Sequence, residues 1–417
     1  MRKLAVAVVL VTLAGCGSGS TRATPETSPN ATPSAGADRA CRGSVPLAKH
    51  DQVVTAVLKG GTALVVSTSG YPASSTGTLR AYDGACAPVE SFGEHGVSTL
   101  TWADETVLYG AEPTADGGAL LTGHSQDHWF LARVDADGKL DAAFGTGGWA
   151  VLPWKGYAES AVEAKDGTFV VGGSEGGGCC VTSYVARLSA HGAIQSAFGT
   201  DGRTKVPNDR VDSGVSGVGE LADGTLLVMA GGGNMGCYGE KVSSYTADGT
   251  AVPGFLHAFE SAWDGSGDPE ANTFVGDLLV GADGFRLVGV RQHGCVGETP
   301  GTDAHGVVAS FHEDGTLATQ TTFPAKMGDN ATPLPQSDGS LIVGVTPLGY
   351  QADDSTQAVL HLVTLTASGA VASSQDLPLP YTGSPSPGAL LATDGHRNLL
   401  VTSTADEGAL ALRNLLS

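Results

Sequence analysis

The chain has 417 residues and is strongly acidic, with 43 Asp and Glu against 22 Lys and Arg and a formal net charge of −21. This balance argues against nucleic acid and anionic lipid headgroups as partners, because an acidic surface repels both. The 61 glycines and the many Thr, Val and Ser residues favour short strands joined by tight turns.

Residues 1–15 have the layout of a secretory signal peptide. Arg2 and Lys3 give a positive start, and residues 4–13 form an apolar run that is too short to span a membrane. The following LAGC sequence closely resembles the bacterial lipobox, which implies cleavage before Cys16 and a thioether link from that cysteine to diacylglycerol, with palmitate as an acyl chain. An ordinary signal peptide with a chance cysteine is the alternative. We therefore expect export and a lipid anchor on the outer side of the cell membrane.

Residues 16–40 follow as a predicted tether. Beyond Cys16 the segment consists almost entirely of Ser, Thr, Pro, Gly and Ala, and it contains no aromatic residue. Such a composition cannot bury enough apolar surface to become ordered. We therefore expect a disordered linker over 16–40 and a folded domain over 41–417.

A glycine-containing turn followed by an apolar strand repeats along the folded part. Successive copies are 50 to 60 residues apart. The seven copies begin at Gly60-Gly61, Asp116-Gly117, Asp166-Gly167, Asp223-Gly224, Asp283-Gly284, Asp338-Gly339 and Asp394-Gly395. Asp-Gly favours the positive φ angles that tight hairpins need. The spacing therefore predicts seven equivalent structural units.

Each unit contains a second turn and, in the early units, a Phe-Gly element. The second turns are expected at Asp83-Gly84, Asp137-Gly138, His191-Gly192, Asp248-Gly249, Asp314-Gly315 and Ser368-Gly369. The Phe-Gly element follows at Phe92, Phe144 and Phe198, each with a glycine three residues beyond its first glycine. Each unit thus offers about four strands.

Seven four-stranded units predict an all-β, seven-bladed β-propeller of antiparallel blades. A single blade cannot bury both of its faces, whereas seven blades stacked around a central channel can. The last unit has three strands before the chain ends, and residues 42–48 precede the first complete strand. We expect residues 42–48 to supply the missing outer strand and so to close the ring.

The Phe-Gly-x-x-Gly element, the LAR(V/L) sequence and the Asp-Gly-(K/T)-(F/L)-V-V-G-G run together resemble the bacterial delta-60 repeat family. The resemblance is strongest over residues 127–206. It implies a propeller on an exported or surface protein, and it implies no defined catalytic residues.

Six cysteines remain after Cys16, and an even number in an exported protein favours disulfides. Cys41 and Cys86 fall at strand ends of the two blades that meet at the ring closure, so we expect a Cys41–Cys86 bridge. The other four lie between the second and third strands of three adjacent blades: Cys179, Cys180, Cys237 and Cys295. Two disulfides among them are expected, either from Cys179 and Cys180 to the other two or as a vicinal pair plus Cys237–Cys295.

The same loops offer an alternative, a zinc or copper site. His293 and His305 could join Cys179, Cys180, Cys237 and Cys295 as ligands. The chain has no C-x-x-C pair with metal spacing, and an oxidising compartment favours disulfides. We therefore expect no metal and no other cofactor.

Other motifs have structural explanations. The carboxylates from Asp135 to Asp141 superficially resemble a calcium loop but lack the twelfth-position Glu, so a hairpin is expected. His124 and His128 are expected at the surface. The five tryptophans are expected to pack between blades, although one or two could line a channel mouth: Trp102, Trp129, Trp149, Trp154 and Trp263.

These features favour a binding function. The leading hypothesis is a monomeric, lipid-anchored scaffold without catalytic residues that binds an extracytoplasmic protein, peptide or glycan through its cysteine-bearing loops. The alternative is a propeller enzyme (glycosidase, lyase or quinone-dependent dehydrogenase) with carboxylates converging at the channel mouth. Acids are plentiful but scattered, as at Asp212, Glu220, Asp264, Asp268 and Glu270.

Overall fold

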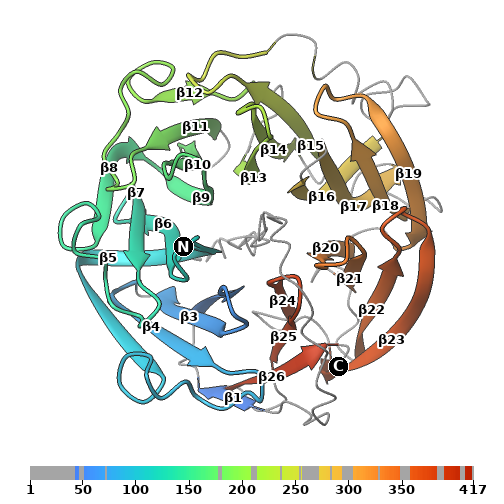
Figure 1. Ribbon diagram of the computed structural model, residues 1–417, viewed down its shortest axis with the longest axis horizontal. Helices are drawn as coiled ribbons and strands as arrows, with labels where there is room; N and C mark the ends of the chain where they lie inside the picture. Colours follow the sequence, from blue (N-terminus) through green and yellow to red (C-terminus); the bar gives the residue numbers. More distant parts are fainter. Residues whose placement is uncertain are drawn as a thin grey trace, which may run out of the picture.

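The computed structural model is a ring of seven radial blades around a central axis, which we call the channel axis (Figure 1). It describes residues 43–46, 51–70, 73–176, 181–207, 214–234, 237–252, 255, 272–281, 284–293, 304–326, 329–347, 357–382, 389–403 and 409–415. All of these lie within the predicted folded domain. The signal peptide, Cys16 and the tether lie outside the described residues. The seven-bladed propeller expected from the repeats is confirmed.

The first three blades form the left side of Figure 1. Blade 1 contains β2 (Asp51–Val57), β3 (Ala63–Gly70), β4 (Ala73–Tyr82) and the first part of β5 (Val97–Pro113). Blade 2 contains the second part of β5, β6 (Ala119–Ser125), β7 (His128–Val134) and β8 (Trp149–Lys155). Blade 3 contains β9 (Tyr157–Glu163), β10 (Phe169–Glu175), β11 (Thr182–Leu188) and β12 (Arg203–Lys205). Because β5 is both the outer strand of blade 1 and the inner strand of blade 2, these two blades form one continuous seven-stranded sheet.

The other four blades complete the ring. Blade 4 has three strands within the described residues, β13 (Gly214–Glu220), β14 (Leu226–Asn234) and β15 (Cys237–Tyr245). Blade 5 contains β16 (Asn272–Gly281), β17 (Gly284–His293), β18 (His305–Phe311) and β19 (Leu317–Pro324). Blade 6 contains β20 (Asp329–Pro335), β21 (Leu341–Pro347), β22 (Gln357–Leu365) and β23 (Val371–Thr382). Blade 7 contains β24 (Ala389–Thr393), β25 (Asn398–Ser403) and β26 (Ala409–Leu415).

The ring closes where the sequence predicts. Strand β1 (Gly43–Pro46) pairs antiparallel with β26, with Gly43 opposite Leu412 and Pro46 opposite Ala409. It is the outer strand of blade 7, so the first and last strands share one sheet. Arg397 of blade 7 reinforces the junction, because its guanidinium donates hydrogen bonds to the carbonyl groups of Gly61 and Tyr82 in blade 1.

The antiparallel strand order divides the ring into two ends. We call the end that carries the first and second turns of every blade the turn face. The opposite end carries the connections between second and third strands and between one blade and the next, and we call it the loop face. Strand β1 runs from the middle of the blade toward the loop face, because Gly43 pairs with Leu412 in the middle of β26 and Pro46 pairs with Ala409, its first residue.

Most turns at the turn face are three-residue loops that place a single residue at positive φ, although Gly60 and Gly61 in the first turn of blade 1 both have positive φ. In blade 2, the N–H of Gly138 donates to Asp135 O and the N–H of Asp135 donates to Lys139 O, with φ of 78° at Gly138. Blade 1 corrects our expectation. There the equivalent position is occupied by Cys86, with φ of 60°, and not by Gly84.

The Phe-Gly elements join each early blade to the next. Phe144 belongs to blade 2, and its ring lies directly beneath Gly192, the second-turn glycine of blade 3. A Cβ added to Gly192 would lie 2.9 Å from that ring. The N–H of Gly145 also donates to His191 O at 2.8 Å. The same phenylalanine-beneath-glycine contact is made by Phe92 with Gly138, Phe198 with Gly249 and Phe255 with Gly315. The repeated motif is therefore an inter-blade contact, which we call the Phe–Gly latch.

Polar groups extend this junction. The hydroxyl groups of Ser98, Thr204 and Thr321 each donate to the carbonyl of the second-turn glycine in the next blade. Arg187 of the LAR(V/L) motif donates to Ala247 O of blade 4 at 2.9 Å and pairs with Asp166 of its own blade. The turn face is thus fully engaged in holding neighbouring blades together.

We expect Gly192→Ala to destabilise the fold much more than Gly167→Ala. The two glycines have φ of 76° and 77°, but a Cβ at Gly167 has nothing within 4 Å, whereas one at Gly192 meets Phe144. Gly167→Ala should cost about 1 kcal/mol of unfolding free energy for the left-handed backbone. Gly192→Ala should cost roughly 2 kcal/mol more, for overpacking. Urea denaturation measures both, and equal losses would contradict the latch.

Candidate functional site

The inner strands of three successive blades carry a β-bulge at the same position. The register shifts between Leu108 and Gly110 in β5, opposite Gly172 and Gly173 of β10 in β9, and between Val215 and Gly217 in β13. The extra residues are Tyr109, Glu159 and Ser216, each seven positions before the aspartate of its first turn. Bulges turn a side chain away from the regular alternation and often do so beside functional sites. Here they present two hydroxyls and a carboxyl near the loop face.

Glu159 bridges blades 3 and 4. Its carboxyl accepts a hydrogen bond from the N–H of Val215 at 2.7 Å and from the hydroxyl of Ser174 at 3.0 Å. Burial raises the pKa of Glu159 to about 7, against the lowering effect of these two donors. The side chain retains some exposure to solvent. At neutral pH this carboxyl is therefore divided between its acid and base forms.

Glu240 repeats the arrangement one blade further on. It extends from β15 and accepts a hydrogen bond from the N–H of Gly276, the inner strand of blade 5, at 2.7 Å. Burial raises its pKa to about 7, while the hydroxyl of Ser216 and the N–H of Gly276 lower it. Two partly exposed carboxyls with raised pKa values thus join blades 3, 4 and 5 near the channel.

Two more carboxyl groups are buried on the inner strands. Glu112 in β5 is 6% exposed and Asp277 in β16 is 1% exposed. Burial, and then the charge of Asp277, raises the pKa of Glu112 well above its ordinary value. Blades 2 and 5 are not neighbours in the ring (Figure 1), so this repulsion acts across the channel. We call Tyr109, Glu159, Ser216, Glu240 and Asp277 the polar arc.

An aromatic cluster lies beside Glu159. The ring of Tyr157 meets those of Tyr109 and His124 edge-on, with centroid distances of 5.7 and 4.9 Å. Burial lowers the pKa of His124, which favours the neutral imidazole, and burial together with Tyr157 and Glu159 raises the pKa of Tyr109. The expectation that His124 is a surface residue is wrong, because it packs between blades 2 and 3.

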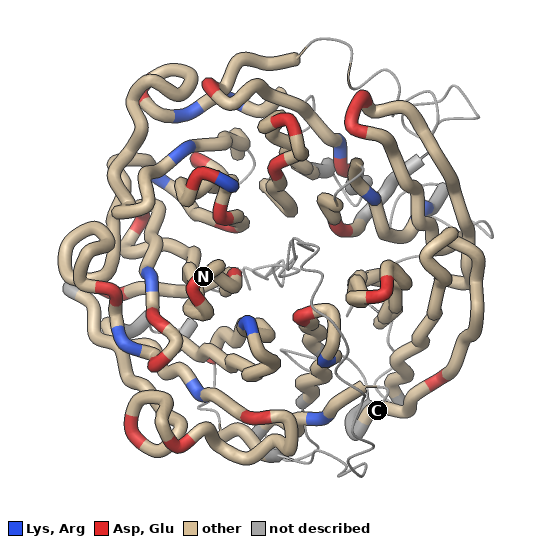
Figure 2. Tube along the Cα trace, viewed as in Figure 1, with Lys and Arg blue, Asp and Glu red and all other residues tan. Residues whose placement is uncertain are grey.

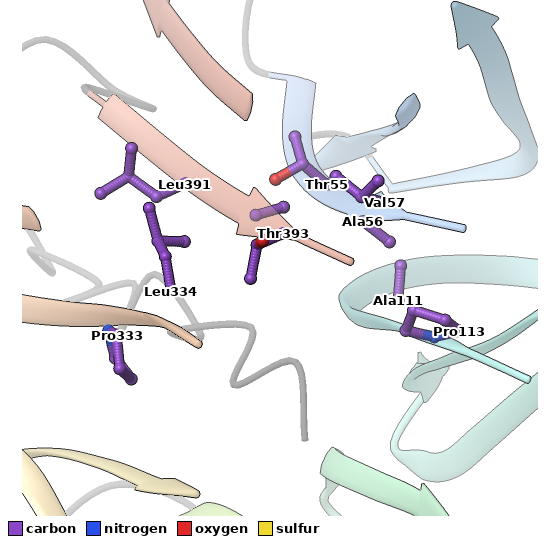
Figure 3. Close-up of a pocket in the computed structure, with 10 residues that line it drawn as sticks. Thr55, Ala56, Val57, Ala111, Pro113, Pro333, Leu334, Leu391 and Thr393 are labelled. Carbon is purple, nitrogen blue, oxygen red and sulfur yellow. The ribbon is translucent and has the colours of Figure 1, made fainter. Parts of the chain in front are cut away.

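An apolar pocket is lined by blades 6, 7, 1 and 2, and its two threonines contribute the only hydroxyl groups among the lining residues (Figure 3). The lining residues are Thr55, Ala56, Val57, Ala111, Pro113, Pro333, Leu334, Leu391, Ala392 and Thr393. None of these ten is ionisable. Figure 2 shows that acidic positions recur on the strands around the centre of the ring. The pocket is therefore apolar, whereas the polar arc spans blades 2 to 5.

The predicted cysteine sites are reached only in part by the described residues. Cys86 is buried and disulfide-bonded, and its expected partner Cys41 lies outside those residues, so the pairing stays a prediction. Cys179, Cys180 and Cys295 also lie outside them. Cys237 is not in a loop as expected but is the first residue of β15, opposite Asn234.

The metal alternative stays a prediction, because three of its ligands, Cys179, Cys180 and Cys295, lie outside the described residues; among the residues that are described, no group of three or more His, Cys, Asp and Glu could hold a metal ion. His293 ends β17 and His305 begins β18. Of the scattered acids, Glu220 accepts a hydrogen bond from Lys165 N at the turn face. The others lie outside the described residues: Asp212, Asp264, Asp268 and Glu270.

The tryptophans behave mainly as packing residues. Trp102, Trp129 and Trp154 are buried, and Trp129 donates from its indole to Ser174 O at 2.9 Å. Asp135 accepts two backbone hydrogen bonds within its turn, as a hairpin requires. Trp263 lies outside the described residues.

The residues of the polar arc were not identified from the sequence. Glu159 and Glu240 stand out because each accepts a hydrogen bond from a backbone N–H of the next blade. No local sequence pattern indicates that the next blade brings an N–H group to these carboxyls. One signal was available: a polar or aromatic residue stands seven positions before the first-turn aspartate in three successive repeats.

No family sequence profile matches the chain, and no curated protein matches it. Solved structures match at the level of the fold. Prolyl oligopeptidase B from Galerina marginata is 12% identical over 91% of this chain and 49% of that chain, with a TM-score of 0.49. Puromycin hydrolase is 14% identical over 87% of this chain and 54% of that chain, with a TM-score of 0.47. An ulvan lyase of a polysaccharide lyase family is 10% identical over 72% of this chain and 76% of that chain, with a TM-score of 0.41. The chain thus spans about half the length of the two hydrolases, and at these identities the likeness concerns the propeller alone.

Within the described residues no helix is long and apolar enough to cross a membrane.

We expect Glu159→Gln to remove a pH-dependent loss of stability. The folded-state pKa of about 7 exceeds the ordinary 4.5, so this group favours the folded state most below pH 4.5, and that contribution is lost as pH rises to about 7. Glutamine keeps an acceptor for Val215 N–H without a charge. From pH 4.5 to 7.5 the variant should gain about 2 kcal/mol relative to the unsubstituted chain. Urea denaturation at both pH values measures the difference, and parallel pH profiles would contradict it.

Proposed function

We propose that this chain is a lipid-anchored, extracytoplasmic propeller of the delta-60 repeat kind that binds a protein, peptide or glycan at the loop-face mouth of its channel. The observation that carries the proposal is the set of bulges that turns Tyr109, Glu159 and Ser216 out of the regular strand pattern in three adjacent blades. Partly exposed polar and aromatic groups on a rigid frame are what a binding site requires.

The direction of the chain's first strand also supports binding at the loop face. Strand β1 runs toward the loop face, and the turn face is occupied by the Phe–Gly latches and their hydrogen bonds. This direction supports a tether that approaches the ring from the turn-face side. The loop face then points away from the membrane, where it is free to meet a ligand.

A second candidate function is an enzyme of the glycosidase or lyase type. The observation that favours it is Glu159, whose pKa of about 7 suits a general acid or base. His124 and Tyr109 lie in the adjoining aromatic cluster and could share in proton transfer. The test is turnover of a polysaccharide by the purified chain. Loss of that turnover in a folded Glu159→Gln variant would establish an enzyme rather than a binding protein.

We expect Cys16→Ala to release the protein from the membrane. In a bacterial host, the unsubstituted chain should sediment with membranes and incorporate labelled palmitate, because lipidation at this cysteine is the proposed anchor. The variant should do neither, while Ser18→Ala in the tether should behave like the unsubstituted chain. A Cys16→Ala variant that stays in the membrane fraction would refute the anchor.

We expect Tyr157→Ala to weaken binding at the proposed site about tenfold or more, as for loss of an aromatic anchor. The purified chain is screened against a peptide library and a glycan array, and affinities for each hit are compared between variants. Lys139→Ala, an exposed change at the turn face, is the matched control. Loss of binding with the control and not with Tyr157→Ala would move the site to the turn face.

A further inference from the structure

We infer that the disulfide of Cys86 takes the place of a Phe–Gly latch at the junction between blades 7 and 1, with Cys41, which precedes β1 in the sequence, as its partner. Closure of the ring by β1 then depends on the redox state of this pair. The inference goes beyond the proposed binding function and does not depend on the identity of a ligand.

The first observation is the position of Cys86 in its turn. The N–H of Cys86 donates to Asp83 O at 2.9 Å and the N–H of Asp83 donates to Ala87 O at 2.8 Å, which is the pattern around Gly138 in blade 2. With φ of 60°, Cys86 therefore stands where blades 2 to 5 have the glycine of the latch. A residue with a Cβ is disfavoured in this conformation, so its side chain needs a contact of its own.

The direction of the Cys86 side chain follows from the latched junctions. A Cβ added to Gly138 or Gly192 would meet the phenylalanine ring of the preceding blade, at 2.5 and 2.9 Å. The Cβ of Cys86 has the same place in its turn, so it points toward blade 7, which precedes blade 1 in the ring (Figure 1). The Cys86 side chain fills the space that a latch ring would need. A covalent bond to blade 7 would therefore join the two blades where the ring contact is missing.

Arg397 shows independently that the sulfur faces blade 7. This arginine belongs to blade 7, and its guanidinium donates from Nη2 to the Sγ of Cys86 at 3.7 Å and from Nη1 to Tyr82 O at 3.1 Å. Cys86 is 6% exposed and lies in the same buried apolar cluster as Val45 of β1 and Leu412 of β26. The sulfur is therefore enclosed at the interface between blade 7 and blade 1.

The register of the closing strand indicates the partner. Gly43 pairs with Leu412 in antiparallel register, so two further residues of the same pairing would bring position 41 opposite Asn414. The amide of Asn414 donates at 2.8 Å to a carbonyl of the second turn of blade 1. Cys41 would then lie beside the turn that holds Cys86, as the short Cα–Cα separation of a disulfide requires. The other cysteines of the folded domain fall in blades 3, 4 and 5 of the sequence.

The bond would hold β1 at both of its ends. This strand has four residues, and β2 of blade 1 follows it closely in the chain. A bond from position 41 to the second turn of blade 1 holds the other end of β1 to the same blade. The strand is then fixed to blade 1 on both sides while it completes the sheet of blade 7. Without the bond, so short a strand should detach from β26 more often.

Formation of the bond is a two-electron oxidation. The thiols of Cys41 and Cys86 give up two protons and two electrons as the S–S bond forms, and a small-molecule disulfide such as oxidised glutathione accepts them and becomes two thiols. The thiolate is the attacking species, and the guanidinium of Arg397, 3.7 Å from the sulfur, favours the thiolate of Cys86. Closure is therefore completed in an oxidising compartment and left incomplete in a reducing one.

Two measurements on the purified chain test the inference. Peptide mapping without reduction should show Cys41 linked to Cys86. Hydrogen exchange followed by mass spectrometry should be about tenfold faster or more in β1 and β26 of Cys41→Ser than of the unsubstituted chain, because the closing strand opens more often. Exchange in β14 of blade 4 should be unchanged. Ala85→Ser, an exposed change in the same turn as Cys86, is the matched control and should leave β1 protected.

A second route covers a Cys41→Ser variant that does not fold. The folded, unsubstituted chain is reduced with dithiothreitol, which becomes a cyclic disulfide, until mapping finds Cys86 as a free thiol. Exchange in β1 should again rise about tenfold. A link from Cys86 to any other cysteine would overturn the inference. Unchanged protection of β1 after loss of the bond would overturn it too, as would an equal rise in β14, which would indicate general destabilisation.

Discussion

The packing of a phenylalanine ring beneath the second-turn glycine of the next blade is the contact on which this ring depends. It explains why two distant features of the repeat recur together, since Gly192 must be a glycine both for its φ of 76° and because a Cβ would strike Phe144. The ring of Phe144 is fully buried and packs edge-on against Phe169, at 5.9 Å between centroids, so it cannot move aside. The recurring residues of a repeat unit are therefore explained by its contact with the next blade as well as by its own strands.

The two ends of the ring are held together by different inter-blade contacts. The turn face is held by ring-beneath-glycine contacts, by backbone bonds such as Gly145 N–H to His191 O, and by arginines such as Arg187. Change there disturbs two blades at once. The loop-face end lacks the ring-beneath-glycine contact among the described residues, and neighbouring blades are joined there by polar side chains, such as Glu159 with the N–H of Val215 and Glu240 with the N–H of Gly276. The candidate site and the inter-blade contacts of that end therefore share residues, while the turn face is held independently of them.

The fold was predictable from sequence to the extent that it depends on local chemistry. Turn glycines and apolar runs recur at near-constant spacing, and the position of residues 42–48 before the first complete blade predicted the closing strand β1. Prediction failed where a residue acts through space or breaks the local rule. Cys86 takes the left-handed position that Gly84 was expected to hold. Glu159 owes its pKa to burial between blades and its hydrogen bond to Val215 on another blade, and neither is written in the residues around it.

The polar arc and the Phe–Gly latches occupy the same part of the ring, and this coincidence has a physical reason. Phe92, Phe144, Phe198 and Phe255 latch onto blades 2, 3, 4 and 5, which carry the buried or half-buried acids described above, on the inner strand in blades 2, 3 and 5 and on β15 in blade 4. Burying a carboxyl without a cation costs stability, whereas burying a phenylalanine ring contributes about 1.5–3 kcal/mol. Blade 6, which makes no such latch among the described residues, also has a half-buried acid on its inner strand, Asp329, whose pKa is raised by burial. The charge of Lys326 acts on Asp329 and lowers that pKa, whereas no lysine or arginine is among the groups that act on the pKa of Glu112, Glu159 or Glu240. The latched blades therefore hold their buried glutamates through a rigid frame, and Asp329 is held beside a cation.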